Sequence, residues 1–343
     1  MLPRFATLEL ENILFSEWAL KNGGTLFPIV FNANLIANKS LLNPSLSISE
    51  DGTGTFVFRS TNYRYLRPVR NLNSLTSTGS IQYLSSQTGA TSNSFFLAHH
   101  DFPSNNLKTS KPIKIDRIQT PILPLSSGFD YSTVEDLRIS RFEGRLILVG
   151  NIATTKGKRR PFYCEVDSIN RDRNHFRLLN LQCLEISNMN MIEKNWVPIE
   201  GHYGKFVRWP MSLQMSGNRI AQVISIFQQE LQTEIFIEQP NIYGGSQFVR
   251  YENGYMGVIH LRKNGIRKNN HQYLHKFFLY DKDFNFVKSS NSFSFLGFDT
   301  EFCSGLSIYK DKIYVSFSCN DSLNFVLSFN RSESLWEHNH DFK

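Results

Sequence analysis

Charged and hydrogen-bonding side chains recur at matched positions in this chain, where short apolar segments begin and end. At the beginnings stand Asn43, Ser45, Glu135, Asp136, Arg138, Lys194 and Ser246, and at the ends stand Arg59, Asn151, Arg208, His260 and Asp321. The set combines carboxylates, bases and neutral polar groups, which a concave sugar-binding site needs. Breaking a glycosidic bond also needs a carboxyl group that protonates the departing oxygen.

Asp136 is the strongest candidate for that carboxyl group. It lies in the sequence EDLR, at the start of a strand otherwise built for a core, where an ionised side chain is costly without partners. Arg138 follows two residues later, so we expect it on the same face and paired with Asp136. The alternative is a structural salt-bridge cluster of Glu135, Asp136 and Arg138 that caps the strand, and the spacing leaves both open.

These residues belong to a hairpin pattern that appears five times, in which a strand, a tight turn and a second apolar strand follow one another. The five copies span residues 43–59, 135–151, 194–209, 244–260 and 303–321. A unit of this size is typical of a propeller or solenoid. The sequence therefore predicts an all-β fold, a five-bladed β-propeller, in which the open ends of the hairpins meet at one end of the ring, the axial mouth. A two-sheet sandwich is the alternative fold.

The rest of the chain fits one propeller domain over residues 1–343. A short helix is expected around residues 13–21, and a strand over residues 25–31 would close the ring by pairing with the last blade. The pairs Glu143-Gly144, Asn253-Gly254 and Lys310-Asp311 are predicted hairpin turns.

Composition narrows the possible partners. The net charge of +7 favours anionic ligands, but the densest basic cluster, Lys156 to Arg160, is interpreted as a solvated hairpin tip, and no nucleic-acid partner is expected. The four cysteines form no CxxC pair, which predicts buried reduced thiols in strands and no metal site. The first 15 residues contain acidic groups among the apolar ones, so we expect no membrane insertion and a cytoplasmic protein.

With these motifs in place, the chain resembles family 130 of the glycoside hydrolases, the β-mannoside phosphorylases and β-mannosidases on a five-bladed propeller. The resemblance covers roughly residues 43–321. It is carried by Asn43-Pro44-Ser45, Arg59, Glu135-Asp136-Leu137-Arg138, Lys194-Asn195, Gly244-Gly245-Ser246, Gly257 to His260, Ser304-Gly305-Leu306 and Asn320-Asp321. The closer likeness is to uncharacterised bacterial members that carry EDLR, KNW-P and GGSQ-VR segments.

The resemblance implies roles for individual residues. Asp136 corresponds to the general acid, Asn43, Ser45 and Arg59 to groups that hold the mannosyl unit, and Lys194 and His260 to part of the set that binds phosphate. Two positions depart from the family: Leu137 replaces a proline of the EDPR motif, and the stretch before Lys194 lacks the further phosphate-binding arginine, for which Arg208 is a spatial substitute.

Three functions stay open at this level. The first is a carbohydrate-active enzyme that acts on β-mannosides or related glycosides, without a cofactor and with inorganic phosphate as a possible co-substrate. In it Glu135, Arg138, Asn151, Ser246 and Asp321 complete the substrate site, and Asp321 or Glu301 would serve as a base if water were the nucleophile. The second is a non-catalytic glycan-binding propeller associated with a glycosyltransferase or surface-polysaccharide system. The third is a protein-interaction propeller.

Overall fold

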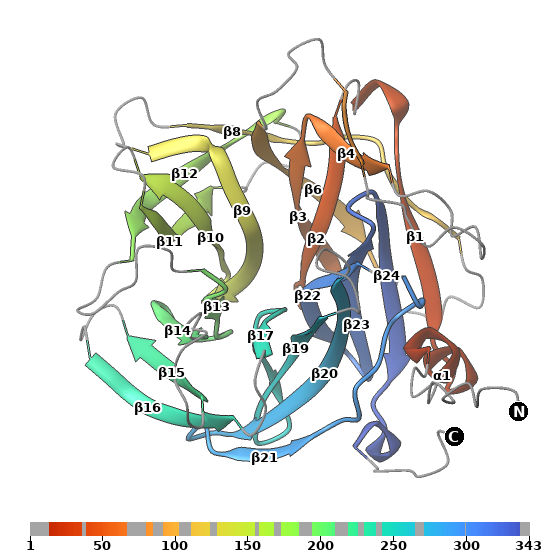
Figure 1. The fold of residues 1–343 in the computed structure, drawn as a ribbon, viewed down its shortest axis with the longest axis vertical. Coiled ribbons are helices and arrows are strands. Elements are labelled where there is room, and N and C mark those ends of the chain that lie inside the picture. The colour runs from red at the N-terminus through yellow and green to blue at the C-terminus, as the bar shows by residue number, and fades with distance from the viewer. Residues whose placement is uncertain are drawn as a thin grey trace, which may run out of the picture.

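The computed structural model describes most of the chain. It covers residues 14–35, 39–66, 80–84, 92–102, 111–123, 129–154, 158–167, 173–184, 194–209, 219–225, 230–237, 242–264, 271–298 and 300–336. The described elements are almost entirely strands, and their sheets stand around a common centre as in a β-propeller (Figure 1).

Each of the five predicted hairpins begins a separate sheet, and we number the sheets in chain order. Sheet 1 is β2 (Ser40–Ile48), β3 (Thr53–Thr61) and β6 (Asn93–Asp101), with the hairpin β4 (Tyr63–Leu66) and β5 (Ser80–Tyr83) between β3 and β6 in sequence. Sheet 2 is β9 (Phe129–Phe142), β10 (Arg145–Thr154), β11 (Arg159–Asp167), β12 (His175–Cys183) and β8 (Thr120–Ile122).

The other three sheets follow the same plan. Sheet 3 is β13 (Val197–Pro198), β14 (Lys205–Arg208), β15 (Arg219–Ser225) and β16 (Glu230–Ile237). Sheet 4 is β17 (Ile242–Gly244) and β18 (Val249–Tyr251), both paired with β19 (Gly254–Asn264), then β20 (His271–Asp281) and β21 (Phe286–Ser289). Sheet 5 is β22 (Glu301–Tyr309), β23 (Lys312–Cys319), β24 (Leu323–Asn330), β1 (Thr25–Phe31) and β7 (Ile113–Ile115).

The N-terminal strand joins the two ends of the chain, as the sequence predicted. β1 pairs antiparallel with β24, with Phe27 opposite Val326. On its other side β1 pairs in parallel with β7, and the chain then runs to β8, which adds a parallel strand to sheet 2. Residues 113–122 therefore link the outer edges of sheets 5 and 2, a connection for which the sequence carried no signal (Figure 1).

The hairpin turns lie at the predicted residues, except in sheet 4, where the turn is shifted by one residue. Glu143, Gly144 and Lys310 have positive φ, as tight hairpins require. In sheet 4 the turn lies one residue earlier than predicted, because Tyr251 pairs with Gly254 and Glu252 takes the left-handed conformation. Gly254 instead sits where a Cβ would collide with the Tyr280 carbonyl.

Apolar side chains fill the spaces between neighbouring sheets. Clusters of Phe, Val, Leu and Ile join sheets 5 and 4, sheets 1 and 5, and sheets 1 and 2. Trp196 and Trp209 are both buried in this core. Cys164, Cys303 and Cys319 are buried thiols, as expected.

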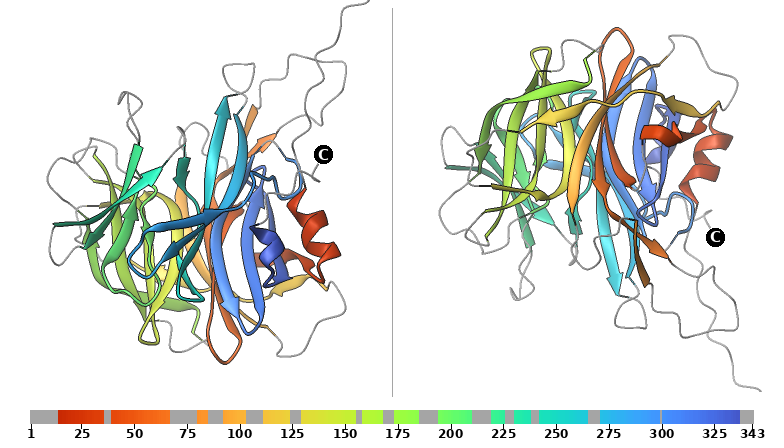
Figure 2. Two further views of the ribbon diagram at one scale, coloured as in Figure 1. Left: turned by 90° about the horizontal axis from the view of Figure 1, so that it is seen from below. Right: turned by 90° about the horizontal axis from the view of Figure 1, so that it is seen from above.

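Helices are few and short in the described residues. α1 (Phe15–Lys21) packs beside β1 and β24 on the outside of sheet 5 (Figure 2), and the 3₁₀ turns η1 (Ala33–Leu35) and η2 (Glu333–Leu335) complete the set. Within the described ranges, no helix has the length and apolar character needed to cross a bilayer.

Candidate functional site at the axial mouth

The inner strands share a local distortion at the predicted mouth. Asn43, Asp136 and Asn195 all have left-handed φ values, of 52°, 51° and 66°. In β2 and β9 this residue lies in a β-bulge, where one extra residue breaks the register against the partner strand. Bulges re-aim side chains next to binding sites, and Asn and Asp tolerate the left-handed region better than other side chains. The sheets therefore present the same kind of polar residue at the same level of the ring.

Asp136 keeps most of its carboxylate uncommitted. Its Oδ2 accepts a hydrogen bond of 3.2 Å from Asn151 Nδ2. Among the described residues, this is the hydrogen bond that the Asp136 carboxylate forms. Asp136 is partly exposed, whereas Asn151 is buried. Two predicted site residues, Asp136 on β9 and Asn151 on β10, are thus brought together.

Glu135, by contrast, is enclosed by two cations. Arg159 Nη1 lies 2.7 Å from Glu135 Oε2, and Arg59 Nη2 lies 3.6 Å from Glu135 Oε1. Arg59 Nη2 also donates to Asn93 Oδ1 at 3.2 Å. Glu135 therefore joins sheets 1 and 2 through two ion pairs, whereas Asp136 forms none with the other described residues.

Arg159 is a mouth residue that the sequence interpretation missed. The basic cluster was expected to be a solvated hairpin tip, but Arg159 is half-buried against Glu135 and Arg160 is buried. That expectation is wrong for both arginines because they belong to β11, not to the turn. The sequence could have shown this, because the pairing of β10 with β11 sets Arg159 opposite Ala153. Ala153 lies two residues beyond Asn151, at the same open end of the sheet.

Arg138 does not face the mouth. It is 0% exposed, and its Nη1 donates to the backbone carbonyl of Asp136 at 2.7 Å, not to the carboxylate. The expectation of a shared face fails because the bulge breaks the two-residue alternation of β9. Burial lowers the pKa of Arg138 to about 10, against the opposing influence of Asp136, so the guanidinium is charged at neutral pH. No surface of Arg138 is left for a sugar.

Three of the predicted sugar-binding residues are occupied in holding the inner strands together. Asn43 Oδ1 accepts from Ser318 Oγ at 2.7 Å, and Ser45 Oγ accepts from the Ile139 amide at 3.0 Å. Ser246 Oγ accepts from the Val258 amide at 2.9 Å. All three are buried, and only Asn43 sits at the level of Asp136.

The predicted phosphate-binding residues lie on sheets 3 and 4. His260 is 5% exposed and is surrounded by the rings of Tyr243, Tyr273 and Phe302, with centroids 5.3–5.5 Å away. Arg208 lies over the buried Trp196, 6.0 Å from the ring centroid. Lys194 is half-buried and immediately precedes Asn195.

The two alternative carboxylates have different surroundings. Glu301 is buried and accepts hydrogen bonds from the amides of Phe295, Leu296 and Phe298, so it holds a loop of sheet 4 and sheet 5 together and is committed there. Asp321 occupies the turn between β23 and β24, where its carbonyl accepts from Ser40 Oγ at 3.1 Å. Of the two, Asp321 is the one with a partly exposed side chain.

Direct contacts between sheets bring the mouth residues together. Arg59 meets Glu135 between sheets 1 and 2, Asn43 meets Ser318 between sheets 1 and 5, and the ring of His260 meets Phe302 between sheets 4 and 5. Sheet 3 is tied in at Gly244, where a Cβ would stand 2.5 Å from the Asn195 carbonyl. Neighbouring sheets are therefore joined at three of the predicted residues, Arg59, Asn43 and His260.

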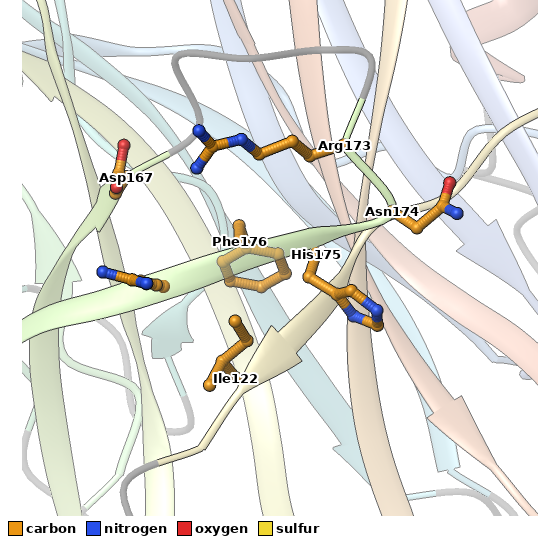
Figure 3. Close-up of a pocket in the computed structure, with 7 residues that line it drawn as sticks. Ile122, Asp167, Arg173, Asn174, His175 and Phe176 are labelled. Carbon is orange, nitrogen blue, oxygen red and sulfur yellow. The ribbon is translucent and has the colours of Figure 1, made fainter.

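A pocket of about 290 Å³ lies elsewhere, on the outer edge of sheet 2. It is lined by Ile122, Asp167, Arg173, Asn174, His175, Phe176 and Arg177 (Figure 3). Its residues come from β8, β11, β12 and the segment just before β12, away from Asn43 and Asp136, and most of them are exposed. We place the candidate site at the mouth because the uncommitted carboxylate and the converging cations lie there.

The ring of sheets defines a β-propeller, and its fold is similar to that of several solved structures. A β-1,2-mannobiose phosphorylase from Listeria innocua matches with a TM-score of 0.54 at 11% identity, over 89% of this chain and 96% of the other. The resemblance to family 130 is thereby confirmed at the level of the fold.

Two further solved structures give the same result. A glycosyl hydrolase from Bacteroides ovatus has a TM-score of 0.53 at 13% identity, covering 85% and 84% of the two chains. A structure from the GH130 family of mannoside phosphorylases, described as containing glycoside hydrolases that target β-1,2 mannosidic linkages in Candida mannan, has a TM-score of 0.54 at 12% identity, covering 87% of each chain. No protein-family model matches the sequence, and no curated protein matches it.

Proposed function

We propose that this protein cleaves β-mannosides or related glycosides at the axial mouth, with Asp136 as the general acid. The observation that carries the proposal is the contrast between two adjacent carboxylates. Glu135 is held by Arg59 and Arg159, whereas the Asp136 carboxylate accepts one neutral hydrogen bond, from Asn151, and is partly exposed. An acid that gives its proton to a leaving oxygen needs that freedom.

In the proposed reaction Asp136 gives its proton to the glycosidic oxygen, directly or through a sugar hydroxyl. The bond from the anomeric carbon to that oxygen breaks, and an oxygen of inorganic phosphate or water forms the new bond to the anomeric carbon. The side chains of Lys194, Arg208 and His260 would hold phosphate on sheets 3 and 4, and Asp321 is the candidate base for water. Phosphate yields a sugar 1-phosphate, and water yields a free sugar.

The test is a screen of β-mannosides and related oligosaccharides, with and without inorganic phosphate. Release of sugar 1-phosphate identifies phosphorolysis, and release of free sugar identifies hydrolysis. In Asp136→Asn we expect turnover to fall about 10²–10⁴-fold with sugar affinity retained. The matched control is Glu143→Gln at the far hairpin turn of the same sheet, where activity should persist. An unchanged rate in Asp136→Asn removes Asp136 as the acid.

A second candidate function is favoured by the commitment of Glu301 to its loop, which leaves Asp321 as the remaining carboxylate suggested for a base. In that case the propeller binds glycans without cleaving them and serves a glycosyltransferase partner. Binding of a mannoside to both the wild type and Asp136→Asn, with no product from either in the presence or absence of phosphate, would establish it.

A further inference from the structure

Directly below the candidate acid, the side chain of Arg138 crosses from sheet 2 to sheet 4. Its Nη1 donates to the Asp136 carbonyl at 2.7 Å, its Nε to the Gly245 carbonyl at 2.5 Å, and its Nη2 to the Gly244 carbonyl at 3.0 Å. We propose that Arg138 is the positioning residue that holds Asp136 in its left-handed conformation and fixes it relative to the segment that leads to His260. The inference rests on the proposed function, since it assigns Asp136 the acid role.

The burial of Arg138 has a large free-energy cost. A guanidinium taken out of water costs several kcal/mol unless it is paired and hydrogen-bonded. Among the described residues no carboxylate lies within ion-pair distance of Arg138, and its donors go to three backbone carbonyls. The five N–H donors of the guanidinium form a rigid planar fork, which suits three acceptors from two segments. The ammonium group of a lysine would not satisfy all three acceptors.

The bulge itself does not require this arginine. Asn43 and Asn195 take the same left-handed conformation on sheets 1 and 3, and the residues two positions later are Ser45 and Val197. What distinguishes sheet 2 is therefore the acid at the bulge together with the guanidinium beneath it. The arrangement serves the placement of Asp136 and not the formation of the bulge.

The Gly244-Gly245 segment, whose carbonyls accept hydrogen bonds from Arg138, is closely packed. A Cβ on Gly244 would stand 2.5 Å from the Asn195 carbonyl, and one on Gly245 would stand 2.5 Å from the Val258 carbonyl. The next residue, Ser246, is bonded through its amide and its hydroxyl to Val258 on β19, the strand that carries His260. Arg138 thus connects the candidate acid with the candidate phosphate-binding side through a short rigid path.

The chain offers a matched control in Gln247. This side chain is also buried and also crosses the ring, where its Nε2 donates to the carbonyls of Leu46 at 2.8 Å and Leu306 at 2.6 Å. It joins sheets 1 and 5 to sheet 4 and has no hydrogen bond to Asp136, Gly244 or Gly245. Loss of either side chain removes a buried tie between sheets, but only Arg138 contacts the acid.

The experiment compares Arg138→Met, Arg138→Lys and Gln247→Met in the full chain, with a mannoside that the wild type turns over. We expect comparable losses of thermal stability in Arg138→Met and Gln247→Met. In Arg138→Met kcat should fall about 100-fold with KM changed less than about threefold, because a small displacement of a catalytic group has that effect. Arg138→Lys should lie between, and Gln247→Met should stay within about threefold of wild type. Equal kcat losses in both Met variants would overturn the inference.

A second measurement separates this inference from the proposed function. Hydrogen exchange should show lost protection in residues 134–140 and 244–248 of Arg138→Met but not of Gln247→Met. If the wild type turns over no glycoside, the proposed function fails while the exchange result still decides whether Arg138 holds the two segments. Unchanged exchange in Arg138→Met would overturn the positioning role.

Discussion

At the scale of single residues, two neighbouring carboxylates on β9 show how different contacts suit chemically similar side chains to different roles. Glu135 and Asp136 have the same chemistry, but the Glu135 carboxylate forms ion pairs with Arg59 and Arg159. Asp136 lies partly exposed in the bulge, with Asn151 as its hydrogen-bonding neighbour. Their different suitability as an acid therefore comes from position and contacts alone.

Asn151 provides the prediction at this scale. Removing its amide in Asn151→Ala takes away a hydrogen bond to a charged group, which is worth about 1.5–3 kcal/mol. We expect turnover to fall by about 10–100-fold, with a smaller effect on KM, because Asp136 loses its orientation. Steady-state kinetics on a mannoside measure the effect. Full activity in Asn151→Ala would show that the bulge alone orients Asp136.

At the scale of elements, β20 carries an unusual buried base. His275 is fully buried against Phe293 and Phe295, and neither ring nitrogen has a hydrogen-bond partner among the described residues. Burial, with a smaller contribution from the neighbouring His260, lowers the pKa of His275 well below its usual 6.5. The strand therefore folds with a neutral imidazole.

The pH dependence of stability follows from that shift. The unfolded chain takes up a proton on His275 below about pH 6.5 while the folded chain does not, so stability is greatest above that pH and falls as the pH drops. Plotted against pH, the free energy of unfolding should have a smaller slope in His275→Phe than in the wild type. Between pH 7 and 5 we expect the difference in slope to reach up to about 1.4 kcal/mol per pH unit. Urea denaturation at several pH values measures this. Identical slopes in the two proteins would mean that His275 is protonated in the fold.

At the scale of the whole molecule, the ring depends on a strand from the far end of the sequence. β1 completes sheet 5 after β24, and its buried Phe27 packs into the cluster between sheets 1 and 5. The exposed side of the same strand carries Val30, which is 47% exposed, whereas Phe27 is 4% exposed. Phe27 should therefore contribute far more to the stability of the fold than Val30.

Phe27→Ala and Val30→Ala test this closure as a pair. Phe27→Ala should lower the free energy of unfolding by about 3–5 kcal/mol, since it leaves a cavity between two sheets. Val30→Ala should change it by less than about 0.5 kcal/mol. Chemical denaturation gives both values. Similar small effects from the two variants would show that the ring is held without β1.

The sequence alone determined the repeated hairpins, the closing strand over residues 25–31 and most of the tight turns. Those features follow from alternating side chains and turn residues, which act over a few positions. It ended the second strands too early, since β3, β10 and β19 continue past Arg59, Asn151 and His260.

Only the tertiary structure decided where the neighbouring charges go. The left-handed bulge turned Arg138 away from the mouth and toward Gly244, more than a hundred residues along the chain, and the fold brought Arg159 onto Glu135 and committed Glu301 to a loop. A bulge shifts the facing of every side chain after it, and contacts between sheets join segments that share no local pattern. Such pairings are settled by packing around the ring, because no short stretch of sequence contains both partners.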